Sequence, residues 1–181
     1  MVERTRMTAA EYFALPETTQ PMELINGIVI RSPSPTPRHQ GIAGNVYALL
    51  RSRAKAGGGR AYMAPIDVVL DDSQVLQPDV VYLAPESRCQ ITERRLVGPP
   101  DLVVEVFSPG SVRRDKIDKF ELYEACGVRE TWMIDPHEQY IEVYHRDGAA
   151  LILQGVYGLG AAFTSALLSG APIPVDELLA D

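Results

Sequence analysis

The sequence predicts a single α/β domain over residues 1–181, in which a central mixed β-sheet is flanked by α-helices. The 181 residues suffice for a sizeable core, and their composition shows no shift that would mark a second domain. Short apolar runs of strand-forming residues alternate with two longer helical patterns. A strand, a helix and a strand follow one another between residues 99 and 134, which is the order of a parallel crossover unit.

Local signals place the first elements. Thr8 and Glu11 have the spacing of a capping box, so a short helix is expected there, ending before Pro16. Asn26-Gly27 lies in the middle of residues 22–30 and predicts a β-hairpin of two short strands.

A longer helix is expected to begin at Thr36 and Pro37 and to end near residue 56, before the glycines 57–59. Its apolar residues recur on one face. His39 precedes Ile42 by three residues and therefore shares that face, so it is expected to point toward the core or a cleft.

The remaining elements follow from apolar runs and turn residues. Residues 86–96 are expected to be a loop or a short helix, and a second long helix should run from Ser111 to Cys126. A last short helix is expected at residues 175–179. The further strands are expected at residues 66–70, 80–83, 99–109, 131–134, 140–145 and 150–156.

Charge is unevenly distributed along the chain. The net charge is -7, which argues against a protein that coats nucleic acid without specificity. Residues 1–119 hold 15 Lys+Arg and 14 Asp+Glu, whereas residues 120–181 hold 2 and 10. A polyanion could therefore approach the first two thirds of the chain, although an unevenly charged solvated surface explains the pattern equally well.

No apolar run approaches the ~20 residues that a membrane-spanning helix needs, and residues 1–12 lack the core of a signal peptide. Cys89 and Cys126 belong to no CxxC pair. We therefore expect reduced thiols, no zinc site, no membrane association and a cytoplasmic location.

One carboxylate stands out, because Glu105 lies in the middle of the apolar strand of residues 99–109. An ionised carboxylate buried without a partner is unfavourable by several kcal/mol or more, so a proton, a cation or a metal ion should lie nearby. Lys116 and Lys119 are expected on the apolar side of the following helix and are candidate partners. Asp79 begins a neighbouring strand and is a second candidate acid.

Two carboxylates on adjacent strands can converge on one hard cation. Mg²⁺ prefers oxygen ligands and usually takes one or two protein carboxylates, together with water and phosphate oxygens. Asp79 and Glu105 are therefore candidate ligands of Mg²⁺, or of Mn²⁺ as a substitute, and the carbonyl of Val106 could be a further ligand. A lysine beside such a site would stabilise developing negative charge.

These motifs resemble known nucleases. Pro78-Asp79 followed by Glu105-Val106-Phe107 is similar to the signature of the PD-(D/E)xK nuclease superfamily. More closely, the order and spacing of several segments resemble the Uma-two family of proposed restriction endonucleases over residues 7–178. The segments that carry this resemblance are residues 23–27, 39–40, 100–109, Asp115, Lys119, Tyr123, 127–128 and 132–136.

The resemblance implies a restriction-endonuclease-like fold and a catalytic set of Asp79, Glu105 and Lys119. The superfamily places its lysine two residues after the glutamate, where this chain has Phe107. In the Uma-two pattern a lysine on the next helix replaces it, and this maps to Lys119. Helical spacing alone does not separate Lys119 from Lys116, so that choice depends on the resemblance.

Each assignment has a structural alternative. Glu105 and Lys119 could form a purely structural salt bridge, Lys119 could extend along the apolar stripe to water, and Asp79 could cap a turn. Arg113 and Arg114 either contact nucleic acid or begin an ordinary solvated helix. Four further residues are expected either to line the site or to serve the structure: Glu23, His39, Asp67 and Lys116.

The predicted function is metal-dependent hydrolysis of phosphodiester bonds in nucleic acid, with DNA as the expected partner. Cutting both strands of a duplex usually needs two active sites, which favours a homodimer. The main alternative is an inactive protein of the same fold that binds nucleic acid or a protein partner. A glycosidase, which would use two acids without lysine or metal, is a third interpretation.

Overall fold

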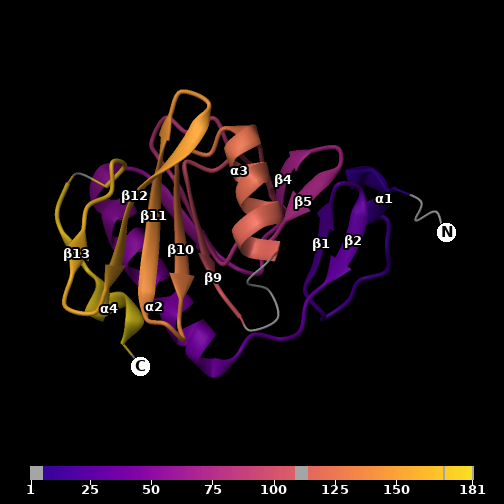
Figure 1. Ribbon diagram of the computed structural model, residues 1–181. Coiled ribbons are helices and arrows are strands. Elements are labelled where there is room, and N and C mark those ends of the chain that lie inside the picture. Colours follow the sequence, from indigo (N-terminus) through magenta and orange to yellow (C-terminus); the bar gives the residue numbers. More distant parts are fainter. Residues whose placement is uncertain (1–5, 109–113, 169, 181) are drawn as a thin grey trace.

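The computed structural model describes residues 6–108, 114–168 and 170–180, apart from the side chains of residues 114–116. Within these residues the chain forms two six-stranded β-sheets, one two-stranded sheet and the helices that cover them. Figure 1 shows the larger sheet between helix α2 behind it and helix α3 in front, with the β1–β2 hairpin to one side. This is the mixed α/β architecture that the sequence predicts.

The larger sheet has the strand order β12-β11-β10-β9-β6-β3. β9 and β10 are parallel, and the other neighbours are antiparallel, so the sheet is mixed. The crossover from β9 to β10 passes through α3, as expected for a strand, helix and strand unit. The bounds are β3 (Arg60–Met63), β6 (Val80–Leu83), β9 (Leu102–Val106), β10 (Glu130–Asp135), β11 (Tyr140–Asp147) and β12 (Ala150–Gly158).

The second sheet has the strand order β2-β1-β5-β4-β8-β7. Its first hairpin turns at Asn26 and Gly27, whose φ angles of 52° and 74° lie in the left-handed region, as the sequence predicts. The bounds are β1 (Met22–Ile25), β2 (Ile28–Arg31), β4 (Val68–Asp71), β5 (Gln74–Leu76), β7 (Gln90–Ile91) and β8 (Leu96–Val97).

The helices begin and end largely where their caps predict. Thr8 forms a complete capping box with Glu11 at the start of α1 (Ala9–Phe13). Thr36 caps α2 (Pro37–Gly57), which ends at Gly58 in the left-handed conformation. α4 (Val175–Leu179) forms as expected and follows the small β13 (Ala162–Phe163) and β14 (Ile173–Pro174) hairpin.

The helix after β9 departs from the expectation. A π-helix, η1 (Arg114–Lys119), precedes α3 (Phe120–Cys126), and the expected cap Ser111 lies outside the described residues. The α-helical spacing of Ile117, Phe120, Tyr123 and Cys126 predicts one apolar stripe, but Ile117 is 46% exposed. The π-helical turn holds more residues than an α-helical turn, so the α-helical spacing misplaces this side chain.

Six short strands were not predicted, namely β3, β5, β7, β8, β13 and β14. β3 and β5 follow glycines and turn residues too closely to give a clear alternation, and residues 86–96 contain part of the β7–β8 hairpin instead of a helix. No helix of the described residues is long and apolar enough to cross a membrane. Cys89 and Cys126 are free thiols, and burial raises the pKa of Cys89 to about 11.

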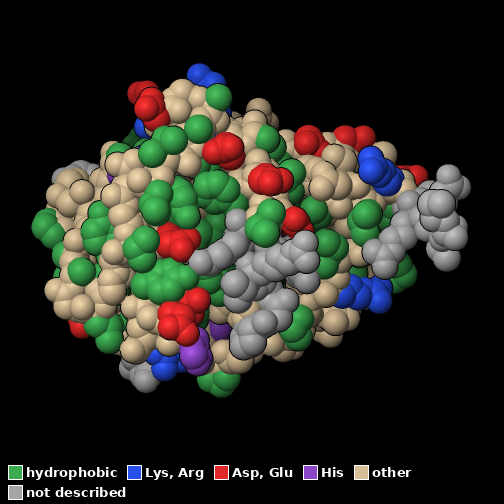
Figure 2. Space-filling view, viewed as in Figure 1, with side chains coloured by type: hydrophobic (Ala, Val, Ile, Leu, Met, Phe, Trp, Pro, Cys, Tyr) green, Lys and Arg blue, Asp and Glu red, His purple; other side chains and the backbone are tan. Residues whose placement is uncertain are grey.

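Two apolar clusters occupy opposite faces of the larger sheet. One contains Val104 and Trp132 with the apolar face of α2. The other contains Val103 with Tyr123 of α3 and residues of the second sheet. Large apolar side chains also stay exposed on the edge strand β12, among them Ile152 and Val156, and Figure 2 shows hydrophobic side chains gathered over that half of the molecule.

A buried carboxylate, Glu130, begins β10 at the opposite end of the sheet from Glu105 and is fully buried. It accepts hydrogen bonds from Trp132 Nε1 at 2.7 Å and from Ser165 Oγ at 3.0 Å, and His145 Nε2 lies 3.5 Å away. Burial raises its pKa above the usual 4.5, because the desolvation of the charged form outweighs these contacts.

Glu130 should therefore make stability depend on pH. The folded protein retains a proton that the unfolded chain releases, so the free energy of unfolding should fall as the pH rises above about 4.5 and level off once Glu130 ionises in the folded state. Denaturant titrations at several pH values in this range give the free energy of unfolding, and its slope against pH should differ between the wild type and Glu130→Gln. Identical slopes would show that Glu130 does not retain the proton.

Candidate active site

A cleft of about 730 Å³ opens where the amino end of α2, the start of β6 and the end of β9 meet. Four acidic or basic side chains line it, Glu23, Asp79, Glu105 and Lys119, together with His39. Val106 also lines the cleft. Six residues that the sequence singles out for a site thus lie around one cavity.

Strand alternation sets the direction of Glu105. Successive side chains of β9 point to opposite faces, so Val104 and Val106 pack on the α2 side. Glu105 shares the other face with Val103, toward α3. It is 2% exposed, so its charge lies in a largely apolar environment at the floor of the cleft.

The helix after β9 supplies the partners of Glu105. Lys119 Nζ lies 3.1 Å from Glu105 Oε1 and 3.3 Å from Oε2, and Lys119 is itself only 4% exposed. One helical turn later, Tyr123 donates its hydroxyl to Glu105 Oε1 at 2.5 Å. The two side chains leave the helix four residues apart and hence on the same side.

Glu23 gives Lys119 a second carboxylate and connects the two sheets. Its Oε1 lies 2.8 Å from Lys119 Nζ, and both side chains are 6% exposed. The same oxygen accepts a hydrogen bond from the backbone N–H of Gln77 at 2.8 Å. Lys119 thereby joins β1 of the second sheet to β9 of the larger one.

Asp79 is held at the start of β6 by two contacts to one oxygen. Asp79 Oδ2 accepts a hydrogen bond from the backbone N–H of Val106 at 2.7 Å and lies 3.2 Å from His39 Nε2. Oδ1 accepts no hydrogen bond from the described residues, and the side chain is 17% exposed. Because β6 and β9 are adjacent, Asp79 sits beside the end of the strand that carries Glu105.

The other expected site residues are placed differently. Asp67 lines a neighbouring pocket, where its Oδ1 accepts a hydrogen bond from Gln77 Nε2 at 2.9 Å. Arg113 and the side chains of Arg114 and Lys116 lie outside the described residues. Asp67, which was expected either to line the site or to serve the structure, thus lies beside the cleft and not in it.

Sequence reasoning missed two contributors. Tyr123 is one of the residues that carry the family resemblance, but its hydroxyl was not expected as a partner of Glu105, although a buried tyrosine hydroxyl usually needs a hydrogen-bond partner. Gln77 contacts Glu23 through its backbone and Asp67 through its side chain. No local pattern indicates the role of Gln77, because both partners are distant in sequence.

The donor set suits a hard divalent cation. Among the described side chains that line the cleft, three are carboxylates and one is a lysine, so with neutral His39 a 2+ ion would balance their charge. Carboxylate and carbonyl oxygens are the ligands that Mg²⁺ takes from proteins. The described residues contain no group of three or more His, Cys, Asp and Glu side chains placed to hold a metal ion.

Comparison with known proteins identifies relatives. The family model Uma2, described as "Putative restriction endonuclease", matches residues 9–176. No curated protein matches the chain. The fold matches a crystal structure described as a putative nuclease belonging to DUF820 from Anabaena variabilis ATCC 29413, with a TM-score of 0.77, 21% identity, and coverage of 96% of this chain and 97% of that chain. At this identity the likeness shows the fold alone.

Lys119→Met tests how far the buried lysine supports the fold. The substitution leaves Glu23 and Glu105 buried without their ammonium partner, so the free energy of unfolding should fall by about 3–5 kcal/mol. Denaturant unfolding measures the change. Lys55→Met, at an exposed position of α2, is the matched control and should have little effect.

Adding Glu105→Gln to Lys119→Met should recover part of that loss, because the double variant buries one carboxylate fewer. A strictly additive double variant would mean that the two side chains do not interact in solution.

Proposed function

The chain belongs to the Uma2 family, and from this membership and the geometry of the cleft we propose that it is a divalent-metal-dependent nuclease that hydrolyses phosphodiester bonds of DNA. The observation that carries the proposal is the convergence of Asp79, Glu105 and Lys119 on one cleft from two adjacent strands and the following helix. The fold class of the family and of the matched structure supports it.

Asp79 and Glu105 would hold the cation, with the carbonyl of Val106 as a further ligand. When bound, Mg²⁺ or Mn²⁺ supplies a Lewis acid that polarises a phosphate and lowers the pKa of an attacking water. The two contacts to Asp79 Oδ2 fix the orientation of that carboxylate. Tyr123 similarly fixes Glu105 through its hydroxyl.

Lys119 would stabilise the negative charge that develops on the phosphate. The lysine position of the superfamily signature is occupied by Phe107, which is 3% exposed and packed in the core. Lys119 reaches Glu105 from the helix instead. Glu23 is a second carboxylate partner that holds the ammonium in place beside Glu105.

One observation favours a second candidate function, an inactive nuclease fold that binds nucleic acid or a protein. Lys119 balances the charge of Glu105 and Tyr123 donates a hydrogen bond to it, so the cluster can also serve a purely structural role without a metal ion. Saturable binding of Mg²⁺ or Mn²⁺ that depends on both carboxylates separates the two functions, because only the nuclease requires it.

Substitution of the two carboxylates tests the proposed function. Asp79→Asn and Glu105→Gln keep the shape of each side chain but remove the charge that would hold the cation. Cleavage of plasmid and single-stranded DNA in Mg²⁺ or Mn²⁺ should fall by more than 100-fold, because even residues outside the ligand set contribute roughly 10- to 100-fold.

Asp72→Asn and Glu86→Gln are the matched controls, since both lie at exposed positions outside the cleft. They should cleave at the wild-type rate, and chelation should stop the wild type. Equal cleavage by the wild type and Glu105→Gln would mean that the activity comes from a contaminant, and the catalytic proposal would be rejected.

A further inference from the structure

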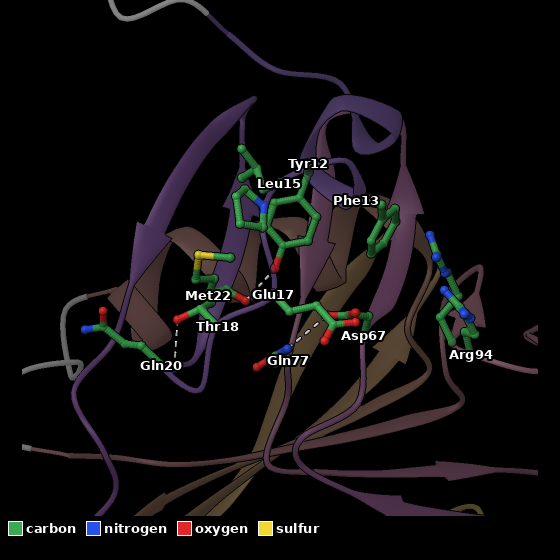
Figure 3. Close-up of a pocket in the computed structure, with 12 residues that line it drawn as sticks. Tyr12, Phe13, Leu15, Glu17, Thr18, Gln20, Met22, Asp67, Gln77 and Arg94 are labelled. Atoms are coloured by element: carbon green, nitrogen blue, oxygen red, sulfur yellow. Dashed lines mark hydrogen bonds between the residues drawn. The ribbon is translucent and has the colours of Figure 1, made fainter.

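A second pocket of about 500 Å³ adjoins the cleft. Thr18, Gln20 and Gln77 line both cavities, so the two lie side by side. Figure 3 shows Gln20 at one side of this pocket, Asp67 and Gln77 facing each other in the middle, and Arg94 at the opposite side. A ligand that extends out of the cleft past Gln77 would therefore enter this pocket.

Two arginines give the far side of the pocket a positive charge. Arg94 and Arg95 lie in the turn between β7 and β8, where Thr92 Oγ1 accepts a hydrogen bond from Arg95 N–H at 3.1 Å and donates one to Arg95 O at 2.7 Å. The guanidinium of Arg95 lies 3.3 Å from the centre of the Phe13 ring, which restricts its motion. Within the described part of the chain, neither guanidinium forms a salt bridge.

The rest of the pocket suits a nucleobase. Phe13 of α1 is partly exposed and provides aromatic surface, and beside it the buried Tyr12 is held by a hydrogen bond from its hydroxyl to Met22 O at 2.8 Å. Asp67 and Gln77 provide polar groups at the middle, and a carboxylate accepts hydrogen bonds from the amino groups of bases. Aromatic and basic side chains together are typical of sites for unpaired nucleic acid.

We propose that this pocket, with Arg94 and Arg95 at its far side, binds a nucleotide that neighbours the scissile phosphate on an unpaired strand of the substrate. The two arginines hold a phosphate, and the base enters toward Phe13 and Asp67. A base enters such a pocket only when it is not paired in a duplex, so the substrate class is single-stranded or locally unpaired DNA. This inference rests on the proposed function.

Gln77 links the pocket to the catalytic cleft. Its backbone N–H holds Glu23, the second partner of Lys119, and its side chain holds Asp67 in the pocket. A ligand in the pocket would therefore contact the residue that also holds Glu23 beside Lys119. This arrangement places the bound strand in a fixed register relative to Glu105 and Lys119.

Binding of a fluorescein-labelled single-stranded oligonucleotide in the presence of a chelator tests the inference. The double variant Arg94→Ala/Arg95→Ala should bind at least ~10-fold more weakly than the wild type at low salt. The slope of log affinity against log salt should also fall by about 0.7 for each lost phosphate contact. Arg51→Ala/Arg60→Ala is the matched control, because it removes the same charge at exposed positions of α2 and β3 outside both cavities.

Three results would overturn the inference: no loss of affinity, an equal loss in both double variants, or an equal loss for a blunt duplex of the same sequence. Arg94→Glu alone, at an exposed position, should weaken binding at an unchanged unfolding temperature, which separates a binding defect from misfolding. Cleavage by Glu105→Gln tests the proposed function separately.

If cleavage depends on Glu105 but the arginine double variant binds as the wild type does, only the pocket is rejected. If binding depends on the arginines but cleavage does not depend on Glu105, only the hydrolysis is rejected.

Discussion

The contact between Lys119 and Glu105 is the interaction on which the rest of the site depends. Glu105 lies in the middle of a strand that is buried on both faces, where a lone carboxylate would be strongly unfavourable. Lys119 supplies the opposite charge, and it also binds Glu23 of the second sheet. One ammonium group therefore fixes the helix after β9 against both sheets and closes the floor of the cleft.

This constraint also accounts for the chemistry that the cleft can perform. Asp79 is attached to the last residue of β9 through the N–H of Val106, so both carboxylates move with the same strand end. Phe107, which follows directly after β9, is buried and carries no charge that could take the place of Lys119. Lys119 instead reaches Glu105 from the following helix, so a tertiary contact places the lysine beside the glutamate.

The elements that could be predicted from the sequence are those specified by interactions between residues close together in the chain. Thr8 with Glu11 and Asn26 with Gly27 specify their elements within a few residues, and both formed as predicted. The misplaced charge of Glu105 pointed to a partner on the next helix because a buried carboxylate needs one. Lys119 proved to be a partner, and the choice over Lys116 had depended on family resemblance.

The remaining features depend on contacts between distant segments. Ile117 is exposed because the π-helical turn changes the spacing, and no local signal marks such a turn. Asp67 lies in the neighbouring pocket because β4 belongs to the second sheet, which sequence periodicity did not separate from the first. Glu130 escaped notice because its partners Ser165 and His145 come from segments that only the fold brings together.

We propose that the cluster around Lys119 and Glu105 is a cation site as well as a structural unit. Titration of Mn²⁺ into the wild type and into Glu105→Gln, followed by electron paramagnetic resonance of the free ion, tests this claim most directly. We expect saturable binding of Mn²⁺ at millimolar or lower concentration in the wild type and the loss of this binding in Glu105→Gln. Equal binding by the two proteins, or none by either, would contradict it.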